Sequence, residues 1–156
     1  GMDTNRLLHE LAEQFPLSLR PHARRVLVSG ADSSLRRLCA AVIRADSHGV
    51  VESADDAVLM EQIRTALVDP VRGRFDVLLR DARTDPSAAL ALLACVRRLD
   101  KALPVVLLVK RPDDIFRRNA HRLGAVLLDA PVESKRLLTV VAGFGIPSAY
   151  RRRRAA

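Results

Sequence analysis

The sequence predicts an α/β fold, a doubly wound parallel sheet with helices on both faces. Two observations carry the prediction. Apolar runs too short to make a helix recur along the chain, and a helical pattern that starts at a capping residue follows each of them. The clearest run, Val77–Leu79, has polar residues on both sides, which is typical of a strand buried on both faces. Five such strands alternating with five helices make a doubly wound sheet.

The first segment, residues 1–24, is predicted to be an extra N-terminal helix and a linker. Asp3 and Thr4 can cap a helix that runs to about Phe15, where Pro16 ends it. Its apolar stripe needs burial against its own domain or against a second copy of the chain.

The first strand is expected at 26–28, followed by a turn at Gly30 and Ala31. Asp32 is a good N-cap for the next helix. The spacing predicts that this helix buries one stripe: Leu35, Leu38, Cys39, Val42 and Ile43.

The second strand is expected at 49–53. Asp55 and Asp56 then open a helix with an apolar stripe: Leu59, Met60, Ile63 and Leu67. A loop over 69–74, with Pro70 and Gly73, leads to the central strand that ends at Asp81. Open α/β sheets place ligands and chemistry at the carboxyl ends of their strands, so Asp81 is the leading candidate site residue.

The next helix starts with Asp85 as N-cap and Pro86 at the first helical position. It is expected to bury an apolar set: Leu90, Leu92, Leu93, Val96 and Leu99. Pro104 begins the fourth strand, 105–109.

Pro112 opens a helix over 113–122, whose expected inward residues are Ile115, Phe116 and Ala120. Gly124 ends this helix as a C-cap, the fifth strand is 126–128, and the last helix covers about 134–142. Residues 25–142 therefore form one domain, and residues 143–156 form a basic C-terminal tail.

The 156-residue chain has a formal charge of +8, and Arg151–Arg154 supply half of it. Such a tail is either solvated or contacts an anionic partner such as nucleic acid. With one Tyr and four Phe, the chain offers few side chains that stack on bases, which weakens the nucleic-acid interpretation. No apolar run approaches the roughly 20 residues of a membrane span, so we expect a cytoplasmic protein without membrane contact.

Four segments from Arg25 to Ala142 resemble the CheY-like receiver domain of bacterial response regulators: Val26–Val28 with Asp32–Arg36, Asp76–Asp81, Pro104–Val109, and Gly124–Pro131. The resemblance implies a flavodoxin-like sheet with strand order 2-1-3-4-5. It also places Asp81 at the position of the phosphoacceptor aspartate.

The sequence departs from the family pattern at the positions that assist phosphorylation. The acidic pair that helps to bind Mg²⁺ falls on Gly30 and Ala31, and the switch Ser or Thr falls on Val109. The switch aromatic falls on Leu127, and the lysine before the proline falls on Ala130. Phosphoryl transfer to a carboxylate relies on a divalent cation and a positive side chain, so ordinary phosphorylation of Asp81 is not expected.

Three residues could compensate for these losses. Asp32 could turn inward towards a metal ion, although capping its helix is the competing role. Arg83 or Lys110 could pair with Asp81 and imitate a permanently switched site without phosphate. Arg80 is expected to alternate away from Asp81 and to lie at the solvent or the sheet edge.

Other features point away from enzyme chemistry. No histidine has ligand or triad spacing, and surface or capping roles are expected for His48 and the others. Cys39 and Cys95 should be buried on opposite faces of the sheet as free thiols. The basic side chains of the 113–122 helix form a candidate partner surface: Arg117, Arg118, His121 and Arg122.

The sequence thus predicts a degenerate receiver, a pseudo-receiver, that signals by contact with a kinase or regulatory protein, or as a homodimer, without a cofactor. One alternative is a working response regulator that binds Mg²⁺ and is phosphorylated on Asp81 by a histidine kinase. Another is a nucleic-acid or nucleotide binder that uses the basic tail. An output domain removed from a longer protein is also compatible with the chain.

Overall fold

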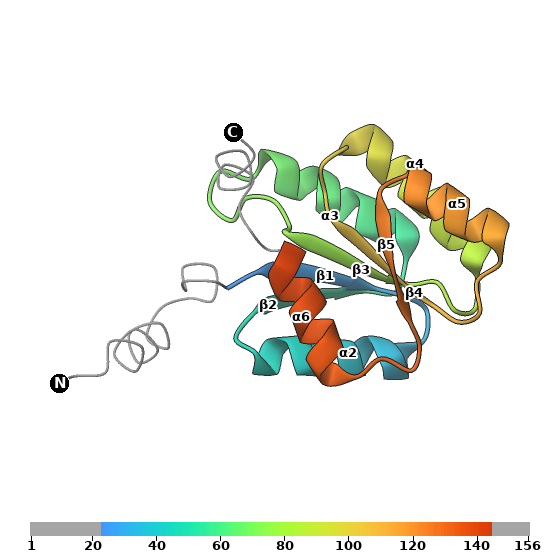
Figure 1. The fold of residues 1–156 in the computed structure, drawn as a ribbon. Helices are drawn as coiled ribbons and strands as arrows, with labels where there is room; N and C mark the ends of the chain where they lie inside the picture. The colour runs from blue at the N-terminus through green and yellow to red at the C-terminus, as the bar shows by residue number, and fades with distance from the viewer. Residues whose placement is uncertain (1–22, 145–156) are drawn as a thin grey trace, which may run out of the picture.

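A computed structural model of the protein describes residues 23–144, so the expected N-terminal helix and the arginine tail lie outside the described residues. Within this range strands and helices alternate (Figure 1). The strands are β1 (Arg25–Ser29), β2 (Gly49–Ser53), β3 (Val77–Asp81), β4 (Val105–Val109) and β5 (Ala125–Asp129). The helices are α2 (Ser33–Ala45), α3 (Asp56–Val68), α4 (Pro86–Leu99), α5 (Asp114–Arg122) and α6 (Ser134–Phe144).

The five strands form one sheet in the order β2-β1-β3-β4-β5, and each neighbouring pair is parallel. The predicted flavodoxin-like order is therefore confirmed. The continuous apolar sequence of β4 follows from its place in the sheet, because all five of its residues are buried. The edge strands β2 and β5 are only partly buried.

The helices cover the sheet in two layers: α2 and α6 lie on one face, and α3, α4 and α5 lie on the other (Figure 1). Alternate residues of each strand enter different cores, as the period of a strand requires. Val77 and Leu79 pack in the core under α2 and α6, whereas Leu78 packs in the core under α3, α4 and α5. Neighbouring strand residues such as Arg80 and Asp81 consequently point to opposite faces.

Aspartate caps begin four of these helices. The side chains of Asp32, Asp55, Asp85 and Asp113 each accept a hydrogen bond from a backbone N–H in the first turn. Each cap satisfies a donor that has no partner inside its helix. The helix starts expected from Asp32 and from Asp85 with Pro86 are confirmed.

Some sequence expectations on side-chain burial are wrong. Leu38 is 61% exposed and Ile115 is 65% exposed, although both were placed on buried stripes. Ala40 of α2 is fully buried although the expected stripe did not include it, whereas Phe116 and Ala120 of α5 are buried as expected. The last helix also runs two residues beyond the expected Ala142.

The cysteines and one histidine also differ from expectation. Both cysteines are free thiols, but only Cys39 is buried, because Cys95 lies on the solvent side of α4. His48 is buried, not at the surface: its Nδ1 accepts a hydrogen bond from the Arg24 N–H at 2.9 Å, and its Nε2 lies 3.2 Å from Asp46 Oδ2. Among the described residues, no helix combines the length and apolarity needed to cross a bilayer.

Candidate functional site

Asp81 is the last residue of β3, at the carboxyl edge of the sheet. Its side chain is only 6% exposed. A carboxylate so nearly buried needs compensating partners, since burial of an unpaired charge is strongly unfavourable. The identity of those partners decides what the site can do.

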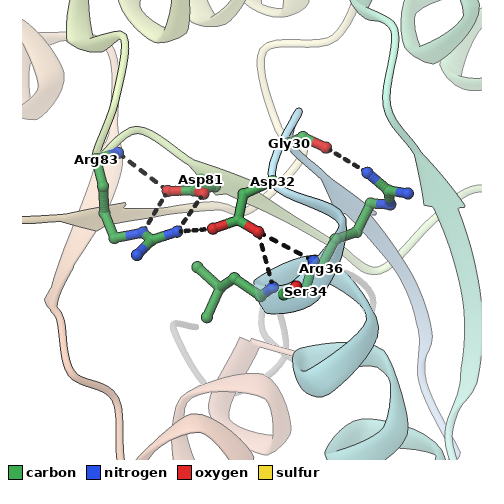
Figure 2. Close-up of polar contacts among 7 residues, drawn as sticks. Gly30, Asp32, Ser34, Arg36, Asp81 and Arg83 are labelled. Atoms are coloured by element: carbon green, nitrogen blue, oxygen red, sulfur yellow. Dashed lines mark hydrogen bonds and ion pairs between the residues drawn. The ribbon is translucent and has the colours of Figure 1, made fainter.

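Arg83 supplies the compensation two residues further along the loop. Its Nε donates to Asp81 Oδ1 and its Nη2 donates to Asp81 Oδ2, each at 3.0 Å, and its backbone N–H donates to Oδ1 at 3.0 Å. Figure 2 shows the guanidinium group as a fork on the carboxylate. Bidentate pairing of this kind is among the strongest polar contacts in proteins. Hydrogen bonding to Asp81 is the main reason that the pKa of Arg83 is raised.

Asp32 holds the other side of the same guanidinium group. Its Oδ2 accepts from Arg83 Nη2 at 2.8 Å, while its Oδ1 caps α2 by accepting from the N–H groups of Ser34 and Leu35 at 3.0 and 3.2 Å (Figure 2). The pKa of Asp32 is lowered, first by the hydrogen bond from Arg83 and next by the backbone donors. The sequence offered capping and turning inward as competing roles for Asp32. In the structure one carboxylate oxygen caps α2 while the other turns inward and binds Arg83.

Gly30 lies directly against Asp81. A Cβ atom at position 30 would stand 2.8 Å from the Cβ of Asp81, closer than real Cβ contacts allow. The Gly30 carbonyl accepts a hydrogen bond from Arg36 Nη1 at 2.7 Å (Figure 2), whereas the side chain of Ala31 is exposed. The present backbone thus has no room for an acidic side chain at position 30.

These contacts do not fit a Mg²⁺ ion. The ion needs oxygen ligands, with one or two carboxylates as anchors. Both oxygens of Asp81 and both oxygens of Asp32 accept hydrogen bonds already, and a guanidinium cation lies between the two carboxylates. In the part of the chain that the structure describes, no cluster of three His, Cys, Asp or Glu side chains could hold a metal ion.

The remaining site positions line up as follows. Val109 is buried at the end of β4 and offers no hydroxyl group. Leu127 in the middle of β5 and Ala130 directly after it are half-buried. Lys110 is exposed and makes no ion pair with any described residue. Of the two cations that the sequence offered as partners for Asp81, the fold brings Arg83 to the carboxylate.

The sequence expectation for Arg80 is half wrong. Arg80 does point away from Asp81, but it is buried, not solvated. Its Nη2 donates to Asp56 Oδ2 at 3.1 Å, and its Nη1 lies 3.5 Å from Ser29 Oγ. Asp56 lies in the first turn of α3, 24 positions before Arg80, so no local sequence pattern could reveal this pair.

The predicted partner surface is exposed as expected. Arg117, Arg118, His121 and Arg122 are all solvent-exposed on α5. The exposed Ile115 on the same helix adds an apolar group to this basic surface. The exposed side of α5 therefore combines positive charge with an apolar group.

Comparison with solved structures identifies the architecture. NtrX from Brucella abortus superposes on 85% of this chain, with a TM-score of 0.69 and 21% sequence identity. CheY4 from Vibrio cholerae matches 78% of the chain (TM-score 0.67, 19% identity), and a CheY-like receiver domain from Methanospirillum hungatei matches 86% (TM-score 0.68, 14% identity). The fold is that of the CheY-like receiver.

The matched lengths differ between these proteins. This chain spans 28% of the NtrX chain but 98% of CheY4 and 99% of the Methanospirillum domain. No family model and no curated protein matches the sequence. The receiver resemblance expected from four short segments is thus confirmed in the fold, with sequence identity of only 14–21% to these three structures.

Proposed function

We propose that this chain is a pseudo-receiver, a signalling domain that acts by contact with a protein partner and not by Mg²⁺-dependent phosphorylation of Asp81. The supporting observation is the Arg83 guanidinium group, which binds both oxygens of Asp81 and one oxygen of Asp32. In this proposal Arg83 takes the place that a metal ion and a phosphoryl group would share, so the receiver is held in one state.

The charge balance of the site supports this interpretation. A phosphoryl group on Asp81 would bring further negative charge next to Asp32, and such transfer depends on cations that are free to move onto the developing charge. The one cation among the described residues that contacts Asp81 is already shared between two carboxylates. Neither Val109 nor Ala130 carries a polar side-chain group to hold a phosphoryl oxygen.

The proposed output is a docking surface on α5. Its basic side chains and the exposed Ile115 suit a kinase, a regulatory protein or a second copy of the chain. Proteins with a similar fold include CheY4, a chemotaxis protein, and a CheY-like response regulator receiver domain from Methanospirillum hungatei, which favours this class of function.

The test is a titration of the ¹⁵N-labelled full chain with Mg²⁺ and beryllofluoride, a stand-in for the aspartyl phosphate. We expect no saturable NMR shifts at Gly30, Asp81 or Arg83. Shifts centred on Asp81 that spread to α5 would instead support the second candidate, a response regulator phosphorylated on Asp81. That candidate is favoured by one feature, the acceptor-like position of Asp81 at the end of β3.

A further inference from the structure

A second polar feature lies at the opposite edge of the sheet from Asp81. The C-terminus of α4, the start of β4 and the turn between α5 and β5 border an open cleft of about 470 Å³. We call it the basic cleft and define it by six of its lining residues: Arg97, Lys101, Leu103, Pro104, Arg122 and Leu123. Pro104 directly precedes β4 and Leu123 lies just before β5, which places the cleft at the amino ends of these parallel strands.

Arg97 is built rigidly into this cleft. Its Nε donates to the Leu123 carbonyl at 2.6 Å, and its Nη1 donates to the carbonyls of Leu103 at 2.7 Å and Asp100 at 3.2 Å. Burial lowers the pKa of Arg97, but an arginine stays charged throughout the physiological range. Its Nη2 makes no hydrogen bond within the described part of the chain, and it faces Gly124, where a Cβ atom would meet it at 3.5 Å.

The positive charge of the cleft has little compensation. Lys101 and Arg122 are exposed and form no ion pair with other described residues. The charge of Asp100 partly offsets that of Arg97. The same carboxylate is also held by other groups: its Oδ1 accepts from the Ala102 N–H at 2.8 Å, and its Oδ2 lies 3.9 Å from Arg74 Nη1. The cleft therefore presents three cations, one of them preorganised, to whatever enters it.

The rest of the lining is apolar. Leu103 is buried beneath the cleft, and Pro104 and Leu123 are half-buried at its wall. No aromatic side chain contributes to the lining. Single-stranded nucleic acids are held by basic grooves that carry aromatic stacking platforms, so this composition fits a peptide better than a base.

We propose that the basic cleft docks an acidic peptide segment of a protein partner. Carboxylates of the segment pair with Arg97 Nη2, Lys101 and Arg122, and an apolar side chain between them packs on Pro104 and Leu123. This site goes beyond the pseudo-receiver function, because it does not involve Asp81 and shares only Arg122 with the proposed docking surface on α5.

The test uses the ¹⁵N-labelled full chain and a short acetylated peptide of alternating glutamate and leucine. We expect saturable shifts at Lys101 and Gly124 and none at Asp81. Arg122→Glu and Lys101→Glu should each weaken binding roughly five- to tenfold, since each converts an attraction into a repulsion. Both side chains are exposed, so the variants retain the fold. Arg37→Glu on the exposed side of α2 is the matched control, with an expected effect below about twofold.

Other outcomes overturn the proposal. One is a glutamine version of the peptide that binds as well as the glutamate version. Another is an equal loss of binding from Arg37→Glu and Arg122→Glu, and a third is a single-stranded oligonucleotide that shifts the same amides at a lower concentration. Failure here is distinct from failure of the pseudo-receiver proposal, because this experiment is read at Gly124 and the beryllofluoride titration is read at Asp81.

Discussion

Arg83→Met is the substitution that probes the central contact of this protein most directly. It keeps the length and apolar stem of the side chain but removes the guanidinium group from Asp81 and Asp32. Among the described residues, Asp81 then keeps only the backbone N–H of residue 83 as a hydrogen-bond donor. We expect a folded but less stable protein.

The size of the loss follows from the burial of the two partners. Removing one member of a buried ion pair costs about 3–5 kcal/mol, whereas an exposed pair contributes about 0–1 kcal/mol. The Asp81 side chain is 6% exposed and the Arg83 side chain is 23% exposed, so the pair lies nearer the buried limit but is not fully desolvated. We expect the free energy of unfolding to fall by about 2–3 kcal/mol, which lowers Tm by roughly 5–10 °C in a domain of this size.

The measurement is urea unfolding followed by circular dichroism, with an unchanged m-value as evidence that only stability has changed. Arg64→Met is the matched control, because Arg64 pairs with Glu61 through two largely exposed side chains on α3. That variant should stay within about 0.5 kcal/mol of the parent protein.

A double-mutant cycle sharpens the test. Once Asp81→Asn has removed the buried charge, adding Arg83→Met should cost at least about 1 kcal/mol less than it does in the parent protein, because no orphaned carboxylate remains. Additive effects of the two substitutions would refute the reasoning. So would an Arg83→Met variant as stable as the Arg64→Met control.

Three further outcomes follow from burial. Ile43→Ala should cost about 2–5 kcal/mol in urea unfolding and Leu38→Ala on the same helix less than about 1, since Ile43 is fully buried and Leu38 is 61% exposed; equal losses would contradict the side-chain placement. Cys95 should react with a thiol reagent in the native protein and Cys39 only on unfolding, because burial raises the pKa of the Cys39 thiol and shields it. Burial lowers the pKa of His48 below its usual 6.5, so the folded protein favours the neutral imidazole. The free energy of unfolding should therefore be highest above pH 6.5 and should fall as the pH drops through the lowered pKa. His48→Gln should remove this part of the pH dependence, and an unchanged profile of stability against pH would contradict it.

Local sequence patterns were enough to predict the elements and their order. The five apolar runs became the five strands, and Asp32 and Asp85 cap helices as expected, because strand burial and helix capping involve residues close together in the chain. The position of Asp81 also followed, since the carboxyl ends of parallel strands meet at one edge. The burial of Leu38, Cys95 and Ile115 was less predictable, because periodicity identifies an apolar stripe but not how far around the helix its contact with the sheet extends.

The partner of Asp81 was decided by the tertiary structure alone. The sequence offered both Arg83 and Lys110 as partners, and in the structure Arg83, two residues from Asp81, binds it and also reaches Asp32, 51 positions away. The pair of Arg80 with Asp56 on α3 likewise joins residues 24 positions apart in the sequence. Such contacts depend on how strands and helices from distant parts of the chain are placed in space, and the periodicity that identifies a strand or a helix carries no information on that placement.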